Sequence, residues 1–457
     1  MKQIRLRFHT AAAEPLQRRR RLVLLSAVVP MWLLAAPAPA QETPSPPPQL
    51  KFVVILTRHG VRPPIWTKEM LNQYSAGAWP NWGVPPGYLT PHGKTLMKLF
   101  GVYDRAYLAR AGLLSPTGCS EAGQVYFWAD TGERTLETGR ALATGMFPGC
   151  PVEVHSLPQG QHDPLFSPFE AGIKPPDRRL AAAAVSGRIG ANPRALEELF
   201  RPELESLERV LLGCKTESPC PPRGAAVKKS LFEEPTALGP GEGDHLAELS
   251  GPIKTGAAFS EDFLLEYLDG MTGNQLGWGR INESNIREML SLHAVHADLM
   301  RRTPTIARAQ ASNLLSHILK AMEQAVASRA VQGALGPPGD RAVVIVGHDV
   351  NISNVAGALG LSWLIEGYQR DDTPPGGALV FELWREPASG FYTVRAYYTS
   401  QTLEQMRTAR PLTLESPPAR APVFLPGSSA ADEGMACGWE AFRRTMEGAI
   451  DPAFVKP

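Results

Sequence analysis

The sequence has no marked excess of charge of either sign. It contains 46 lysine and arginine residues and 45 aspartate and glutamate residues. Seven of these basic residues and one acidic residue fall in positions 1–40, so the rest of the chain has 39 basic and 44 acidic residues, a net charge of −5. This composition predicts neither a nucleic acid nor a membrane surface as a partner. Basic residues that bind an anion must therefore be gathered locally.

The sequence also lacks an uninterrupted apolar run of the ~20 residues that a membrane-spanning helix needs. Its best candidate, residues 22–34, follows four consecutive arginines and is interrupted by Pro30, and Ala-Pro-Ala follows at 38–40. A basic segment, a short apolar segment and an A-x-A site are typical of a signal peptide, which we favour over a membrane anchor for residues 1–40. The proline-rich residues 41–50 then predict a tether. We expect a periplasmic or secreted protein with no membrane segment after cleavage.

Cysteine is scarce, with five residues in the whole chain. No spacing of cysteine and histidine resembles a zinc site, and the sequence gives no basis for expecting a metal or an organic cofactor. Export makes disulfides the default expectation. Cys214 and Cys220 would close a tight loop. Cys119 and Cys150 would close a longer one, which leaves Cys437 over.

Continuous apolar runs that end in polar turns predict the strands of an α/β protein. Residues 52–56 are five consecutive β-favouring or apolar residues, typical of a strand buried on both faces of a parallel sheet. Residues 125–130 and 341–346 repeat this pattern. A segment with helical periodicity follows each of the first two strands, as in the repeating unit of an α/β sheet.

The middle of the chain has a different character. Residues from about 175 to 330 show helical periodicity and few strand signals, which predicts a mainly helical insertion. It would divide an α/β core formed by about 51–170 and 331–450. The runs 376–384 and 392–399 predict paired strands, with an antiparallel edge as one arrangement.

Polar residues follow three of the predicted strands, at 58–62, at 130–134 and at 348–349. Two arginines flanking His59 cannot pack in an apolar core, because buried guanidinium groups require anionic partners. Arg58, Arg62 and Arg134 would together supply forked N–H donors for the three terminal oxygens of a phosphoryl group. The sequence therefore predicts a phosphate monoester as the ligand.

The remaining polar residues suit phosphoryl transfer. A neutral His59 inside this cradle of arginines would attack phosphorus and form a phosphohistidine. A leaving alkoxide needs a proton, which Asp349 would donate most readily at acidic pH, given an ordinary pKa of about 3.9. His348 is then expected to bind the transferred phosphoryl group, so that no metal is required.

These residues carry a family resemblance. Residues 58–64, Arg-His-Gly-Val-Arg-Pro-Pro, closely resemble the RHGxRxP motif of the histidine acid phosphatases, and 347–351 resemble their second, HD, element. Further matches cover nearly the whole mature chain and are similar to the bacterial periplasmic branch that contains phytases and glucose-1-phosphatases. These matches are residues 78–80, 89–93, 133–135, 163–168, 277–279, 290–293, 373–377 and 401–407.

The resemblance implies a phosphoglycerate-mutase-like fold over residues 51–457. This is an α/β domain with a mixed, mostly parallel sheet flanked by helices, a smaller α-helical domain, and a phosphate pocket between them. By position it assigns His59 as nucleophile and Asp349 as proton donor. Asp130 and Met271 are further candidates for substrate binding. The implied phosphate ligands are Arg58, Arg62, Arg134 and His348.

Several departures from the family pattern bear on the substrate. Ile65 and Trp66 stand where bacterial phytases typically have Thr-Lys, and Val350 replaces the usual hydroxyl residue after HD. The stretch 270–278 has the length seen in the glucose-1-phosphatase branch. The family partner of Cys437 is absent. The pairs that match family disulfides are Cys119–Cys150 and Cys214–Cys220.

We therefore expect an exported, monomeric acid phosphatase of phytase type that hydrolyses phytate and related phosphate monoesters through a phosphohistidine. A sugar-phosphate phosphatase, such as a glucose-1-phosphatase, is the alternative enzyme. A phosphoglycerate mutase is disfavoured, because export leaves few such substrates. The alternative outside catalysis is a periplasmic protein that binds phosphoesters without turnover.

Overall fold

The computed structural model describes residues 46–214, 228–432 and 434–456. Within these residues the central sheet has eight strands in the order β10, β8, β7, β1, β6, β2, β3, with β9 paired to β8. The strands are β1 (Gln49–Arg58), β2 (Val125–Ala129), β3 (Val154–His155), β6 (Ala342–Gly347), β7 (Ala378–Arg385), β8 (Tyr392–Ser400), β9 (Ala419–Pro422) and β10 (Cys437–Gly438).

The sheet is mixed, and most of its strands run in one direction. β1, β6, β2 and β3 pair in parallel, whereas β7 is antiparallel to β1 and β8 is antiparallel to β7. β9 and β10 are antiparallel to β8, so only β7, β9 and β10 oppose β1 among the described strands. This confirms the predicted fold class. The parallel half contains the continuous apolar strands, which are buried on both faces.

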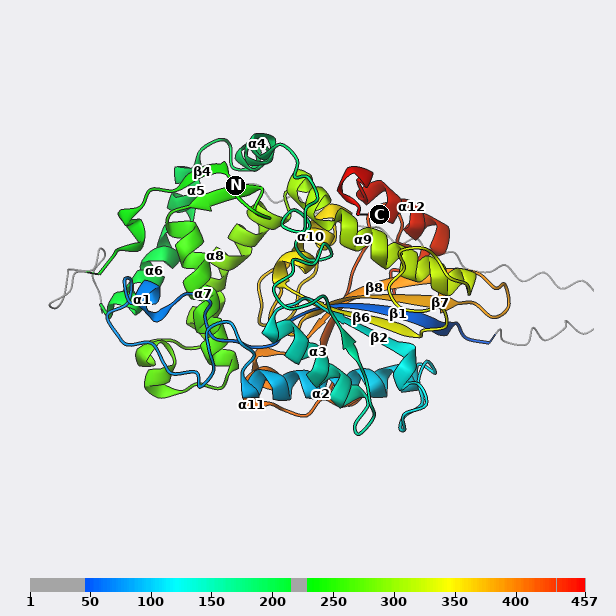
Figure 1. Ribbon diagram of the computed structural model, residues 1–457. Coiled ribbons are helices and arrows are strands. Elements are labelled where there is room, and N and C mark those ends of the chain that lie inside the picture. The colour runs from blue at the N-terminus through cyan, green and yellow to red at the C-terminus, as the bar shows by residue number, and fades with distance from the viewer. Residues whose placement is uncertain (1–45, 215–227, 433, 457) are drawn as a thin grey trace, which may run out of the picture. The chain divides into compact units, whose positions relative to one another are not determined.

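Helices cover both faces of the sheet (Figure 1). Alternate residues of β1 point to opposite faces, as strand geometry requires. Val53 and Ile55 join one buried cluster, while Val54 and Leu56 join the other. The helices on the first face are α2 (Pro91–Arg110) and α3 (Glu133–Met146), and those on the second are α9 (Pro304–Ala327), α10 (Asp349–Leu359) and α12 (Trp439–Ala449).

The described residues of the segment predicted as helical are mainly helical, with one short hairpin that the pattern did not predict. Two of its helices are separated at Phe200, because Pro202 fits the first turn of a helix but not its interior. The elements are α4 (Arg178–Arg188), α5 (Pro193–Leu199), α6 (Arg201–Leu212), β4 (Ala237–Pro240), β5 (Ala247–Ser250), α7 (Pro252–Leu268) and α8 (Glu283–Arg301). The remaining short helices of the described residues are α1 (Lys68–Leu71), α11 (Leu403–Thr408) and 3₁₀ turns at Ala122–Gln124, Leu231–Glu233, Gly273–Gln275, Gly277–Gly279 and Pro452–Phe454.

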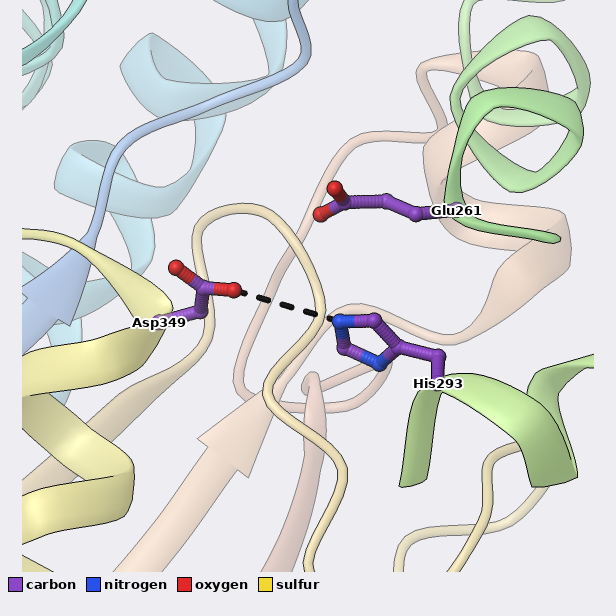
Figure 2. A group of neighbouring side chains, drawn as sticks. All are labelled: Glu261, His293 and Asp349. Atoms are coloured by element: carbon purple, nitrogen blue, oxygen red, sulfur yellow. Dashed lines mark ion pairs between the residues drawn. The ribbon is translucent and has the colours of Figure 1, made fainter. Parts of the chain in front are cut away.

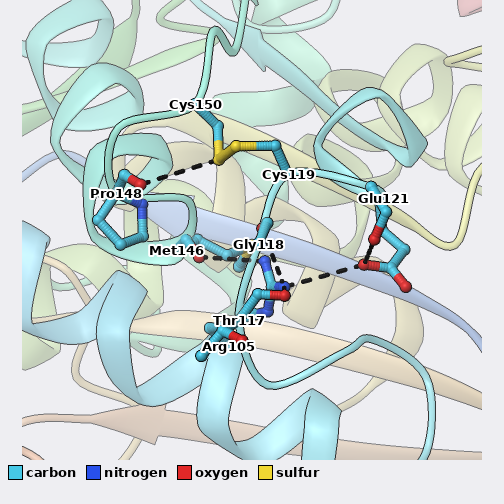
Figure 3. Close-up of a disulfide and its surroundings, with 9 residues drawn as sticks. Arg105, Thr117, Gly118, Cys119, Glu121, Met146, Pro148 and Cys150 are labelled. Atoms are coloured by element: carbon cyan, nitrogen blue, oxygen red, sulfur yellow. Dashed lines mark hydrogen bonds and ion pairs between the residues drawn. A yellow bond between two sulfur atoms is a disulfide. The ribbon is translucent and has the colours of Figure 1, made fainter.

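The predicted Cys119–Cys150 disulfide is present, with its Cα atoms 5.5 Å apart. It joins the loop after α2 to the end of α3 (Figure 3). Beneath it, the buried guanidinium of Arg105 donates to the carbonyls of Met146 at 3.3 Å and Thr117 at 3.1 Å. The disulfide and the arginine therefore hold the same loop against α3.

Two other cysteine predictions have different outcomes. Cys220 lies outside the described residues, and so does its predicted pairing with Cys214. Cys437 is a free cysteine, and burial raises the pKa of its thiol to about 11. It is therefore a neutral packing residue.

No helix in the described ranges is long and apolar enough to cross a membrane.

Candidate active site

The sheet brings the predicted phosphate-binding residues together at one edge. Arg58 is the last residue of β1 and lies in register with Gly347 at the end of β6. β2 pairs with β6 on its other side, so Asp130 follows the neighbouring strand end. His348 and Asp349 then begin α10, and Arg134 lies in the first turn of α3. The polar residues that follow these strands therefore lie close together.

His59 is held by its backbone and by one ring nitrogen. Its amide donates to the carbonyl of Gly347 at 3.0 Å, and its Nδ1 donates to the carbonyl of Gly60 at 2.8 Å. Because a carbonyl only accepts, Nδ1 carries the proton and Nε2 keeps its lone pair. Gly60 lets Leu89 and Met97 pack against the backbone beside His59, because a methyl group on its Cα would lie 2.9 Å from atoms of both side chains.

The protonation state of His59 suits a nucleophile. Burial, together with the charges of Arg134, Arg58 and Arg62, holds its pKa well below the ordinary value. An exposed histidine is mostly charged at about pH 5, given its ordinary pKa of about 6.5. His59 therefore remains a neutral imidazole in acid, with a free lone pair on Nε2.

The three predicted arginines surround this histidine. Arg58 and Arg62 are 1% and 7% exposed. Within the described residues, the buried Nε of Arg58, Arg62 and Arg134 has no hydrogen-bond partner. Unpaired buried donors are costly, and three of them around one histidine make a site for an anion. These unpaired donors are the strongest structural mark of a phosphate cradle.

A carboxylate that the sequence did not predict already occupies part of the cradle. Glu261 on α7 is paired with Arg58 through Oε1 and with Arg62 through Oε2, the second at 3.2 Å. Burial alone would raise its pKa, but Arg58 and Arg62 outweigh burial and lower that pKa to about 2. Glu261 is therefore ionised and occupies guanidinium donors that a phosphate group would use.

His348 is linked to Asp130 and Arg134. Its Nε2 lies 2.7 Å from Oδ2 of Asp130, and its Nδ1 lies 3.4 Å from Nη2 of Arg134. Burial alone would raise the pKa of Asp130, but the hydrogen bond from His348 outweighs it and the pKa is lowered. The ionised Asp130 therefore accepts a hydrogen bond from Nε2–H of His348. The other ring nitrogen of His348 contacts Arg134, which belongs to the cradle. Its ring centroid is 5.5 Å from that of His59.

Asp349 lies in a setting that the sequence did not reveal. Its Oδ2 is 2.5 Å from Nη1 of Arg301 at the end of α8, and 3.9 Å from Nε2 of His293 on the same helix. Burial alone would raise its pKa, but Arg301, Arg58 and His293 outweigh burial and hold it well below the ordinary value. The predicted proton donor is therefore a carboxylate in the free protein.

Met271, Ile65 and Trp66 are the other residues that the sequence linked to the substrate. Met271 follows α7, its side chain is buried in the core, and its carbonyl accepts from Nη2 of Arg407 at 2.8 Å. Ile65 is 60% exposed beside Gly87, where a methyl group would lie 3.6 Å from Ile65 and 3.8 Å from Nη1 of Arg134. Trp66 packs edge-on against Phe259. The apolar Ile65 thus borders the cradle.

One cluster among the described residues has the composition of a metal site. Glu261, His293 and Asp349 offer ligand atoms within 4.8 Å of one another (Figure 2). Both carboxylates, however, already pair with arginines, which disfavour a cation by direct repulsion. We assign no metal to this cluster.

A cradle of arginines around a neutral, buried histidine has the chemistry that phosphoryl transfer requires. Residues 49–177 and 258–399 match the family model of the histidine phosphatase superfamily (branch 2). The chain belongs to this family. It is a histidine acid phosphatase, a hydrolase of phosphate monoesters.

Known relatives match over nearly their full lengths. Phytase AppA of Escherichia coli is 34% identical, with 94% of this chain and 98% of that protein covered. Glucose-1-phosphatase of Salmonella typhimurium is 31% identical, with 94% and 99% covered. The solved structure of Hafnia alvei phytase in complex with tartrate has a TM-score of 0.81 at 34% identity, covering 92% of this chain and 100% of that one.

Proposed function

We propose that this chain is an exported acid phosphatase of phytase type. The proposed reaction transfers a phosphoryl group from phytate or a related monoester to Nε2 of His59 and then to water. The observation that carries the proposal is the neutral His59 among three arginines whose buried Nε donors have no partner in the described residues. The similarity to a phytase over nearly the full length supports the substrate class.

In the first proposed step, the phosphate dianion binds Arg58, Arg62 and Arg134, and Glu261 leaves the arginines. The arriving negative charge also raises the proton affinity of Asp349 by offsetting the charge of Arg58. Nε2 of His59 attacks phosphorus, the ester bond breaks, and Asp349 protonates the leaving oxygen. In the second step water, deprotonated by Asp349, displaces the histidine.

We also propose the locations and partners that the sequence predicts. Residues 1–40 act as a signal peptide, residues 41–50 act largely as a tether, and the mature protein is a periplasmic or secreted monomer. The Cys119–Cys150 disulfide supports export, since such bonds persist in oxidising compartments. β1 begins at Gln49, so the last two residues of the proposed tether already belong to the sheet.

A sugar-phosphate phosphatase is the second candidate function. It is favoured by Ile65, an exposed apolar side chain at the border of the cradle, where further phosphate groups of phytate would need polar partners. Measuring kcat/KM for phytate and for glucose 1-phosphate at about pH 5 separates the two candidates. We expect the higher value for phytate. A clear preference for glucose 1-phosphate would reject the phytase assignment while keeping the phosphatase chemistry.

The position of Glu261 leads to a prediction about phosphate binding. Glu261→Gln removes the carboxylate that competes for Arg58 and Arg62. We expect inorganic phosphate to bind about tenfold more tightly, equivalent to ~1.4 kcal/mol. The same variant should unfold at a lower temperature without phosphate, because two buried arginines lose their partner. Titration calorimetry and thermal unfolding with and without phosphate measure both effects.

The neighbouring acid provides a matched control. Burial raises the pKa of Asp262 well above the ordinary value, which favours its neutral form, and Asp262 forms no ion pair with an arginine among the described residues. Asp262→Asn should therefore leave the affinity for phosphate unchanged. Weaker phosphate binding in Glu261→Gln would show that Glu261 assists the arginines and does not compete for them.

A further inference from the structure

A buried histidine lies behind Asp349. His293 is on α8 and is 6% exposed. Figure 2 shows its ring directed at Asp349, with Nε2 3.9 Å from Oδ2. On its other side, Nδ1 lies 3.4 Å from Oδ1 of Asp372, which is 4% exposed. Neither ring nitrogen makes a hydrogen bond within the described residues.

The two carboxylates beside the ring match the two N–H donors of an imidazolium. A neutral imidazole has one N–H donor, whereas the imidazolium has two and can serve a carboxylate on each side. The carboxylates of Asp349 and Asp372 lie beside different nitrogens of the ring; Asp372 is buried, and the side chain of Asp349 is 15% exposed. The titratable or charged groups that face His293 are Asp349, Asp372, Glu261, Arg301 and His296.

The proposed reaction needs a proton at this place. Asp349 must protonate the leaving oxygen, yet Arg301 and Arg58 keep its carboxyl ionised in the free protein. His296, the other histidine on this helix face, does not store a proton in the range of interest, because burial lowers its pKa to about 3. His293 is the histidine whose ring faces Asp349, and the 3.9 Å between Nε2 and Oδ2 must shorten to hydrogen-bond length before a proton can pass.

We propose that His293 is a positioning residue that stores the catalytic proton and passes it from Nε2 to Asp349, with Asp372 holding the Nδ1–H. This inference rests on the proposed function of Asp349. As the ester bond breaks, its electron pair stays on the leaving oxygen. The proton on Nε2 of His293 passes to Asp349 and from Asp349 to this oxygen, so Asp349 is again a carboxylate and the ring is neutral with its proton on Nδ1.

The second half of the reaction restores the proton. The oxygen of water forms a bond to phosphorus while the bond to Nε2 of His59 breaks. The proton released by water passes to Asp349 and from there back to Nε2 of His293. The sum is ester and water converted to alcohol and phosphate, so no further reactant is required.

The test compares pH profiles for two leaving groups. In the wild type, the proposed proton is shared by Asp349 and His293. The alkaline limb of the plot of kcat against pH therefore reports the loss of this proton from the pair, not from either residue alone. His293→Gln should move that limb to lower pH and reduce kcat for glycerol 2-phosphate about tenfold to a hundredfold at about pH 6. For 4-nitrophenyl phosphate, whose leaving group needs no proton, kcat should stay within about threefold.

Two further variants complete the test. Asp372→Asn removes the anion that holds Nδ1–H and should shift the same limb in the same direction, even if His293→Gln fails to fold. His317→Gln is the matched control, because that ring is on α9 and bonds the carbonyl of Gly333. It should leave both profiles unchanged.

The outcomes separate the inference from the function on which it rests. Equal losses for both substrates, with unshifted limbs in His293→Gln and Asp372→Asn, would show that the pair is only structural. A covalent phosphoryl group trapped on these variants with 4-nitrophenyl phosphate would show that the proposed function survives this failure. If the wild type itself forms no covalent intermediate, the proposed function has failed.

Discussion

His59→Ala is expected to lower phosphate release from phytate, at acidic pH, by about 10⁴-fold or more, because the variant lacks the atom that forms the covalent intermediate. The ring it removes carries its proton on Nδ1 and directs a free Nε2 into the cradle of arginines. Colorimetric phosphate release by purified wild type and variant measures the loss. Comparable activity in the variant would reject the nucleophile.

Binding distinguishes a catalytic loss from a folding defect. The arginines of the cradle remain in His59→Ala, so inorganic phosphate should still raise its unfolding temperature. A matched control is His162→Ala, which removes a half-exposed histidine paired with Glu170. That variant should keep wild-type turnover. If wild-type protein binds phosphate and phosphate monoesters without releasing phosphate, the protein is a binding protein and not an enzyme.

Asp349→Asn is expected to show a loss that depends on the leaving group. For glycerol 2-phosphate, kcat should fall about 10²-fold to 10⁴-fold, because the alkoxide leaves without a proton. For 4-nitrophenyl phosphate the loss should be much smaller. Steady-state kinetics with both substrates measure the difference. Asp298→Asn, which removes another carboxylate near the end of α8, is a control that should leave both rates unchanged.

Equal losses of activity with both substrates would count against Asp349 as the acid. They would instead indicate that its charge is needed to hold Arg301, with which it forms its shortest ion pair. Thermal unfolding of Asp349→Asn then gives the independent check. A large fall in stability would accompany the structural role, since removing one partner leaves a partly buried arginine unpaired.

The parallel strands and the residues at their ends could be predicted from the sequence. Continuous apolar runs mark β1 and β6, and the carboxyl ends of neighbouring parallel strands must meet at one edge. Arg58 and His59 can therefore be placed beside His348 without knowledge of any helix. Local patterns and one rule of sheet geometry are sufficient for this placement.

The helical side of the site could not be predicted in the same way. Glu261, His293 and Arg301 lie on α7 and α8, in segments whose apolar periodicity says which face is buried but not which strand end it meets. The three acids in the apolar run 259–268 were the available signal for Glu261. The ionised state of Asp349 depends on Arg301, so it follows from tertiary contacts alone.

The most direct test of the proposed mechanism is to trap the phosphoryl enzyme. Wild-type protein is mixed with 4-nitrophenyl phosphate at acidic pH, quenched in alkaline denaturant that preserves phosphohistidine, and digested for mass spectrometry. We expect a single phosphoryl group on the peptide that contains His59, and none in His59→Ala. Full turnover with no phosphorylated peptide, or with the phosphoryl group on another residue, would contradict the mechanism.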